Sequence, residues 1–262
     1  MTQKKYTSPF NKLSLPKLEP GPQMLSFSLG NAKLKGLHTA LFNLPAGYTC
    51  PGACECLSHF DRVEQRVIDG PNTEFRCYAA SIEAAFKSVR DSVDRNLAIL
   101  KGARTTAAMA EVIDLSLPSK YYHRIRIHGD GDYYSAAYFL AWVQVAVENP
   151  QRTFYGYTKN LPVWIKYREC IPENMVLTAS RGGKWDRLIE PNKLRSAVVV
   201  YHPDEAERLG LEIDHDDSHA RDPHGGDFAL LIHGTQPAGS DAAEAKKRLD
   251  KEDIKYAYSL KK

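Results

Sequence analysis

The sequence predicts an α/β fold, a partial or complete (β/α) barrel with a cysteine-rich insertion after an early strand. Two observations support this. From residue 121 onward, short apolar runs typical of strands alternate with helical runs, which is the pattern of parallel βαβ units. Several of these strands also end in polar side chains. Ligands of parallel sheets bind at the carboxyl ends of the strands, so this pattern predicts a cleft there.

The composition is that of a globular chain long enough for one large domain. Its 262 residues include 35 basic and 32 acidic ones, and 43% of them are hydrophobic. The net charge of +3 gives no general basic field, so nucleic acid is not an expected partner. No apolar run reaches the roughly 18 residues of a membrane span, and the N-terminus lacks the apolar stretch of a secretory signal. We expect a cytoplasmic location, where thiols stay reduced.

The expected organisation is an extended arm over residues 1–23, a single domain over 24–245 and a charged helix or tail over 246–262. Two β-like runs are expected between residues 24 and 45, before a cysteine segment over 46–80. Residues 80–114 repeat apolar side chains at helical spacing, which indicates a helix covering the core. A further helix is expected after residue 135, with Ser135 as its N-cap and Asn149-Pro150 as its stop.

Polar side chains mark the ends of five predicted strands. They are His128 and Asp130, then Tyr157 and Lys159, then Ser180 and Arg181, then His202, and finally His233. We interpret this set as the rim of an enzyme-like cleft, although polar residues also occur simply where a strand meets its loop.

Four of the five cysteines lie close together in the sequence. Cys50, Cys54 and Cys56 stand in "CPGACEC", and Cys77 follows after a 20-residue interval. A count of five and a reduced compartment argue against a disulfide framework. Zinc sites favour paired C-x2-C spacings, which this segment lacks, so the spacing favours an iron–sulfur cluster and keeps zinc as the alternative. Cys170 lies in an apolar helical pattern, which predicts a buried structural thiol.

Several motifs resemble the gene-eighty-eight product family of tailed phages, over roughly residues 24–245. They are "LPAGYTCPGACECLSHF…FRCYAAS", "RIHGDGDYYSAAYFLAWVQVAVENPQRTFYGYTKNLP", "LTASRGGKWDRLI", "IDHDDSHA" and "DFALLIHGTQPAGS". The family pattern matches Cys50, Cys56 and Cys77, whereas Cys54 is an addition. The cysteine motif is similar to that of radical S-adenosylmethionine enzymes, whose cluster loop follows the first barrel strand. The last cysteine gap is longer than in those enzymes.

The resemblance implies a virus-encoded protein, and the cysteine spacing leads us to expect that it carries a [4Fe–4S] cluster supplied by the iron–sulfur assembly machinery of the host cytoplasm. The expected ligands are Cys50, Cys54, Cys56 and Cys77. Three thiolates would leave one iron open to a substrate or to S-adenosylmethionine, and four would close the cluster. Gly129 and Gly131, in "HGDGD", are similar to the glycine-rich strand end that contacts that cofactor.

Other residues allow different chemistry. His128 is a candidate base with Asp130 or Asp132 as its orienter. Arg181, Gly182 and Gly183 offer a weak anion or phosphate signal. In "DHDDSH", His215 and His219 would share a helical face and bind a second metal, or the segment is an acidic turn with solvated histidines.

Three functions are therefore open. The first is an iron–sulfur protein of redox or radical type, with His128, Asp130, Lys159, Arg181 and His233 in its cleft. The second is a hydrolase that pairs Ser180 with His202 or His233 beside a structural cluster. The third is a binding module held together by zinc or a cluster.

Overall fold

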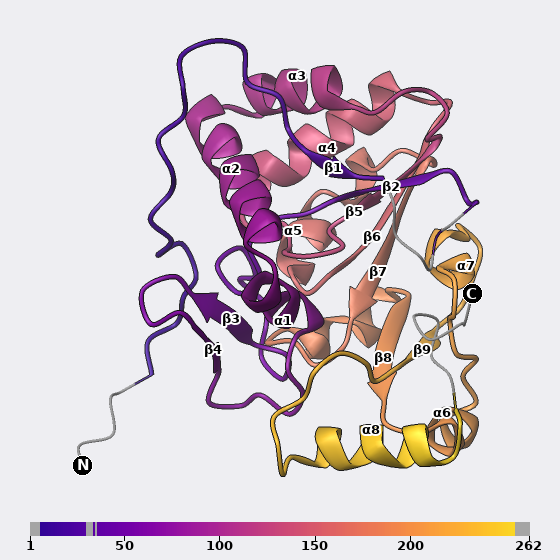
Figure 1. Cartoon of the computed structure of the whole chain (residues 1–262). Helices are drawn as coiled ribbons and strands as arrows, with labels where there is room; N and C mark the ends of the chain where they lie inside the picture. Colours follow the sequence, from indigo (N-terminus) through magenta and orange to yellow (C-terminus); the bar gives the residue numbers. More distant parts are fainter. Residues whose placement is uncertain (1–5, 30–33, 35, 255–262) are drawn as a thin grey trace.

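The computed structural model describes residues 6–29, 34 and 36–254. It is a mixed α/β fold built on a seven-stranded sheet with the order β1-β2-β5-β6-β7-β8-β9 (Figure 1). The strands are β1 (Phe27–Ser28), β2 (Thr39–Phe42), β5 (Arg124–Ile127), β6 (Thr153–Thr158), β7 (Met175–Ser180), β8 (Ser196–Val200) and β9 (Phe228–Leu231). Each pair from β2 to β9 is parallel, and β1 joins β2 antiparallel. The predicted α/β class with parallel units is therefore confirmed.

The sheet is open over the described residues, so the predicted complete barrel is wrong. Closure would require β2 to pair with β9, but both strands already have another neighbour at that side. β1 occupies the outer edge of β2, and the residues before α7 line the outer edge of β9 through a bridge between Ile213 and Ala229. Their backbone groups are used there, which leaves them unavailable for closing the sheet.

Helices precede, connect or follow the strands of the sheet. They are α1 (Tyr78–Ala85), α2 (Lys87–Ala103), α3 (Thr106–Ser116), α4 (Ala136–Glu148), α5 (Leu161–Lys166), α6 (Pro203–Leu209), α7 (Ser218–Arg221) and α8 (Asp241–Lys251). Ser135 caps α4 as predicted, because its Oγ accepts a hydrogen bond of 3.2 Å from the Tyr138 N–H. The predicted helical stretch over 80–114 is three helices, because Phe86 is extended and Arg104 has a φ of 62°.

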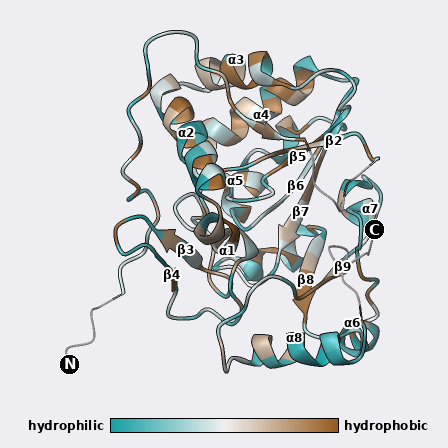
Figure 2. Cartoon of the chain, in the orientation of Figure 1, coloured by the Kyte–Doolittle hydropathy of each residue, from teal (hydrophilic) through white to brown (hydrophobic). Residues whose placement is uncertain are grey.

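The two faces of the sheet have different environments. Ile125, Ile127 and Phe154 are fully buried in the main core, together with Trp142 and Phe139 of α4. Burying side chains of this size contributes about 1.5–3 kcal/mol each. Figure 2 shows α1 as largely hydrophobic and α6 and α8 as mostly hydrophilic. Alternation along each strand turns the intervening side chains to the opposite face, where the cavity described below lies.

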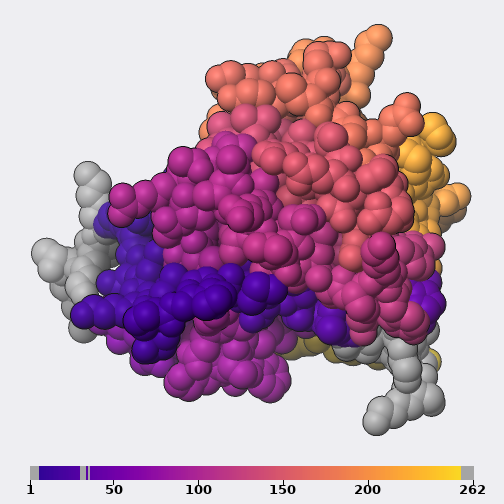
Figure 3. All heavy atoms as spheres, turned by 90° about the horizontal axis from the view of Figure 1, so that it is seen from above, coloured from indigo at the N-terminus to yellow at the C-terminus, as the bar shows by residue number. Residues whose placement is uncertain are grey.

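The described part of the N-terminal arm, residues 6–23, is extended. Seen from above, it forms a continuous band across the surface of the molecule (Figure 3). Leu13, Leu15 and Leu18 pack against the main core, which explains why a segment without secondary structure stays on the surface. The predicted ends at residues 1–5 and 255–262 lie outside the described residues.

No helix in the described ranges is long and apolar enough to cross a membrane.

Candidate cysteine-lined site

A β-hairpin returns the chain from Cys56 to Cys77. The predicted 20-residue interval contains β3 (Ser58–Asp61) and β4 (Arg66–Asp69), which pair antiparallel. At the base of the hairpin, the Leu57 carbonyl accepts hydrogen bonds of 2.6 Å from Gly70 N–H and from Thr73 Oγ1. The 20 residues between Cys56 and Cys77 therefore form a hairpin whose two ends lie side by side.

The loop that carries Cys50, Cys54 and Cys56 follows β2 directly, as the sequence predicts. Its backbone pairs with the turn after β7, through a bridge between Ala53 and Gly183 and a hydrogen bond of 3.0 Å from Glu55 N–H to the Gly182 carbonyl. On its other side, the carboxylate of the fully buried Glu83 accepts a 2.7 Å hydrogen bond from Ala46 N–H. The loop is thus fixed to the sheet and to α1.

Gly52 is required for this close approach. A Cβ at Gly52 would collide with the backbone carbonyl of Lys159, at the end of β6. We expect Gly52→Ala to lower the unfolding free energy by roughly 2 kcal/mol, because backbone has to move. Gly102→Ala is the matched control, since nothing lies within 4 Å of its added Cβ in α2, and it should be neutral or stabilising. Urea denaturation of both variants measures the difference, and equal effects would contradict it.

A cavity of about 700 Å³ lies beside this loop, at the carboxyl ends of the parallel strands. Cys50, Cys56 and Cys77 line it, and Cys54 is not among its lining residues. The Cys54 Sγ instead faces the hairpin, where Asn72 Nδ2 lies 4.0 Å away. All four cysteines are free thiols in the structure. The cavity therefore separates Cys54 from the other three.

The three cavity thiols share one electrostatic environment. Burial raises the pKa of Cys50 and of Cys56, and it raises the pKa of Cys77 to about 12. Repulsion from the negative charges of Cys77 and Cys56 raises the pKa of Cys50 further. Repulsion from Cys56 raises the pKa of Cys77 in the same way. Without a cation these groups hold their protons at neutral pH, and a bound metal would displace them.

Within the described ranges, no group of three or more His, Cys, Asp and Glu side chains is gathered as the ligands of one metal ion. A single zinc ion would hold its sulfur ligands within roughly 4 Å of one another. A four-iron cluster bonds each thiolate to a different iron and spaces the sulfurs more widely. The two groups therefore differ in the sulfur spacing that they require.

Asp130 follows β5 and lines the same cavity. It is 9% exposed, and its carboxylate has no hydrogen bond or ion pair among the described residues. Burial raises the pKa of Asp130 to about 6, against the partial effect of the Arg126 charge. Gly131, with a φ of 87°, lets this loop turn against Thr49 and Leu44. The predicted polar strand end therefore includes a carboxylate without a protein partner that faces a cavity.

His128 does not have the arrangement expected of a base. Its Nε2 lies 3.0 Å from the Tyr138 hydroxyl, and neither Asp130 nor Asp132 orients it. Burial lowers the pKa of His128 to about 3, so the ring stays neutral at physiological pH. Asp132 has a structural role, because it accepts hydrogen bonds from Thr158 Oγ1 at 2.6 Å and from Lys159 N–H at 2.9 Å.

The other predicted rim residues divide into two groups. Tyr157, Lys159, Ser180 and His233 line the cavity, with Gly129 and Gly131 beside them. The Lys159 ammonium is fully used, since it donates to the Ser180 carbonyl and hydroxyl, both at 3.0 Å, and to the Arg181 carbonyl.

The remaining rim residues face elsewhere. Arg181 pairs with Glu190 at 2.7 Å, and His202 caps α6 and contacts Glu252 at 2.8 Å. Gly182 and Gly183 donate their N–H groups to Asp186, so the predicted phosphate cradle is already filled by that carboxylate. Cys170, predicted to be buried, is exposed because α5 ends at Lys166.

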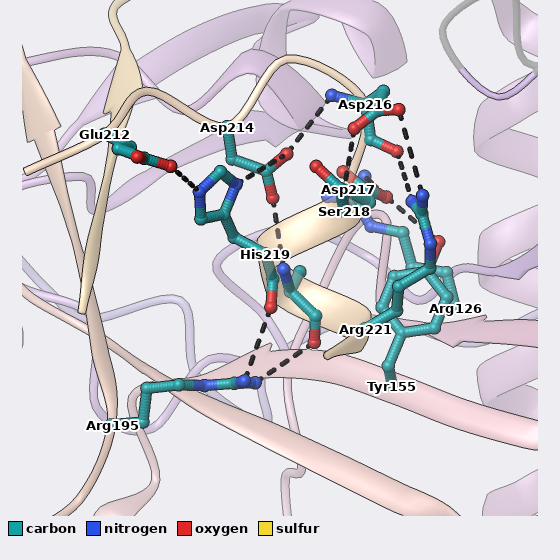
Figure 4. Close-up of polar contacts among 11 residues, drawn as sticks. Arg126, Tyr155, Arg195, Glu212, Asp214, Asp216, Asp217, Ser218, His219 and Arg221 are labelled. Atoms are coloured by element: carbon teal, nitrogen blue, oxygen red, sulfur yellow. Dashed lines mark hydrogen bonds and ion pairs between the residues drawn. The ribbon is translucent and has the colours of Figure 1, made fainter. Parts of the chain in front are cut away.

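The predicted helical metal pair of His215 and His219 does not form, because α7 begins only at Ser218. The structure instead has the alternative that the sequence allowed, an acidic turn in this segment. Figure 4 shows His219 between two carboxylates, with Nε2 2.9 Å from Glu212 and Nδ1 3.8 Å from Asp214. Asp217 instead pairs with Arg126 at 2.8 Å. These contacts fasten α7 against the sheet, where it packs on β6 and β7.

Sequence reasoning missed Arg126 and Asp214, which line the cavity. The signal for Arg126 was its place in "RIRI", where it alternates with the two isoleucines that face the main core. Asp214 lies in "DHDDSH", where sequence reasoning singled out the two histidines and not this carboxylate.

The fold and the cavity together define an α/β protein with a cysteine-lined site at the carboxyl edge of its sheet. The family model described as Gene product 88 matches residues 19–251. The chain therefore belongs to the Gene product 88 family. It is similar to the Gene 88 protein of Mycobacterium phage L5, with 32% identity over 90 residues, which are 32% of this chain and 38% of that protein. The match thus spans well under two thirds of that relative. No solved structure matches the chain. The predicted membership of a phage family is confirmed.

Proposed function

We propose that this protein binds a [4Fe–4S] cluster through Cys50, Cys56 and Cys77, with one iron open to a ligand in the cavity. The observation that carries the proposal is the division among the cysteines. Three of them line one 700 Å³ cavity, and Cys54 lies outside its wall. Such a cluster, when bound, supplies one-electron chemistry and an open coordination position. The protein's own contribution would be to hold three thiolates and to select the ligand.

The position of the loop supports a radical-enzyme type of arrangement. The cysteine loop follows β2, the first strand of the parallel series, and the "HGDGD" turn follows β5, the strand beside it. Two adjacent strand ends would then offer the cluster and a ligand-binding carboxylate to the same space. S-adenosylmethionine is one candidate ligand, and an unidentified small molecule bound directly to the open iron is the other.

The charges around the cavity favour a ligand with a donor or positive group. Arg126 is paired with Asp217, Lys159 with backbone carbonyls, and Arg76 with Asp69. Asp130 keeps a carboxylate without such a partner. A ligand that offers an ammonium or N–H group to Asp130 would regain the hydrogen bonds that burial removed.

Anaerobic reconstitution with iron and sulfide tests the proposal. We expect a brown protein that absorbs near roughly 400 nm, as thiolate-bound clusters do, with an electron paramagnetic resonance signal on reduction. A spectral change on addition of S-adenosylmethionine would support that ligand. If the spectrum does not change, another small molecule is the expected ligand of the open iron. Colourless protein that binds stoichiometric zinc would overturn the cluster proposal in favour of a zinc-stabilised binding module.

A further inference from the structure

The segment that carries Cys77 is fastened to the loop after β9. One side chain, Gln236, makes two hydrogen bonds of this connection across 160 residues of sequence. Its Oε1 accepts a 2.7 Å hydrogen bond from Arg76 N–H, and its Nε2 donates to the Arg76 carbonyl at 3.2 Å and to the His233 carbonyl at 2.8 Å. Gln236 is only 9% exposed, so water does not replace these bonds readily.

These bonds act on the residue immediately before Cys77. Both backbone groups of Arg76 are held by one carboxamide, while its side chain pairs with Asp69 of the hairpin through a 2.9 Å bond. On the other side, Cys77 N–H donates to Ser58 Oγ at 3.3 Å and α1 begins at Tyr78. The backbone is therefore fixed immediately before and after the cysteine, and the direction of its Cα–Cβ bond is set.

We propose that Gln236 is a positioning residue that directs the Cys77 thiol into the cavity beside Cys50 and Cys56. Its part in cluster binding rests on the proposed function, but the positioning itself belongs to the metal-free protein. Two further contacts between these segments have longer distances. Ser81 Oγ donates to the Thr235 carbonyl at 3.4 Å, and the Tyr78 ring lies 5.3 Å from the His233 ring. Ser81 therefore offers a matched control between the same segments.

The test measures the alkylation of each cysteine in metal-free protein by iodoacetamide and mass spectrometry. In Gln236→Met, which keeps the volume but loses the amide, we expect the Cys77 rate to rise about tenfold relative to Cys50. Ser81→Ala should leave that ratio unchanged. Gln236→Glu, which keeps only the acceptor for Arg76 N–H, is the second variant if the methionine variant does not fold, and the same rise is expected. An unchanged ratio, or an equal rise at all cysteines through global unfolding, would overturn the proposal.

Iron uptake separates this inference from the proposed function. If the parent protein binds the cluster, Gln236→Met should bind less iron and sulfide, while Ser81→Ala binds as the parent does. Normal iron content in a Gln236→Met protein with a raised Cys77 ratio would overturn the role in cluster binding. If the parent binds no iron but the alkylation ratio still rises, the positioning stands and the cluster proposal fails.

Discussion

Cys54→Ala is expected to keep the full iron and sulfide content of the reconstituted protein, whereas Cys77→Ala is expected to lose it. The reason is the placement of the sulfurs. Cys77 lines the cavity with Cys50 and Cys56, and Cys54 faces Asn72 of the hairpin. Removing a direct ligand should lower cluster affinity by more than about tenfold, since losing a mere supporting contact of a metal ligand already costs 10- to 100-fold. Iron and acid-labile sulfide analysis after anaerobic gel filtration measures the difference.

Cys170→Ala is the control for general thiol loss, because Cys170 is exposed and lies in the segment after α5. It should behave as the parent does. Loss of the cluster in Cys54→Ala would show four thiolate ligands and a closed cluster, which suits electron transfer or a structural role. Full iron content in both Cys54→Ala and Cys77→Ala would remove the cavity from the cluster altogether.

The alternation of strands and helices could be predicted from the sequence because each element carries local signals. The α4 helix has its serine cap and its asparagine stop, and the predicted α/β class follows from such units. Closure of the sheet had no such signal. It depends on which backbone groups meet at the two edges, where β1 pairs with β2 and Ile213 bridges to Ala229 of β9. Local patterns therefore predicted the strand–helix units correctly, but they could not show that the sheet stays open and does not close into a barrel.

The candidate site was predictable only in part for the same reason. Cysteine spacing identified the loop, and the family resemblance set Cys54 apart as an addition while still counting it among the four expected ligands. The hairpin that returns Cys77, and the facing of Cys54 toward Asn72, are results of three-dimensional pairing. Gln236 carries no local signal at all, because its role comes from hydrogen bonds to a residue 160 positions away. A residue whose role is to orient another residue far away in the sequence therefore cannot be identified from local sequence patterns.

Asp130 is expected to have a large effect on how stability depends on pH. Its pKa in the folded protein is raised by burial to about 6 from an ordinary value of 3.8. An acid whose pKa is raised on folding contributes stability that is fully present below its unfolded value and is lost as the pH rises through the folded value. The metal-free protein should therefore lose unfolding free energy between about pH 4 and pH 7, and this carboxylate accounts for up to about 3 kcal/mol of the loss.

Asp130→Asn removes the ionisation and keeps the shape, so this variant should be more stable than the parent at pH 7.5 and equal to it near pH 4. Urea denaturation of both proteins across this range gives the difference at each pH, and other titrating groups cancel in that difference. Asp69→Asn is the control of opposite sign. Burial alone would raise the pKa of Asp69, but hydrogen bonds from Arg76 and Ser58 lower it, so that variant should be less stable at pH 7.5. A difference between Asp130→Asn and the parent that does not change with pH would show that Asp130 is already neutralised by a partner. A buried carboxylate that destabilises the folded protein by this amount is expected where a ligand supplies hydrogen bonds to it.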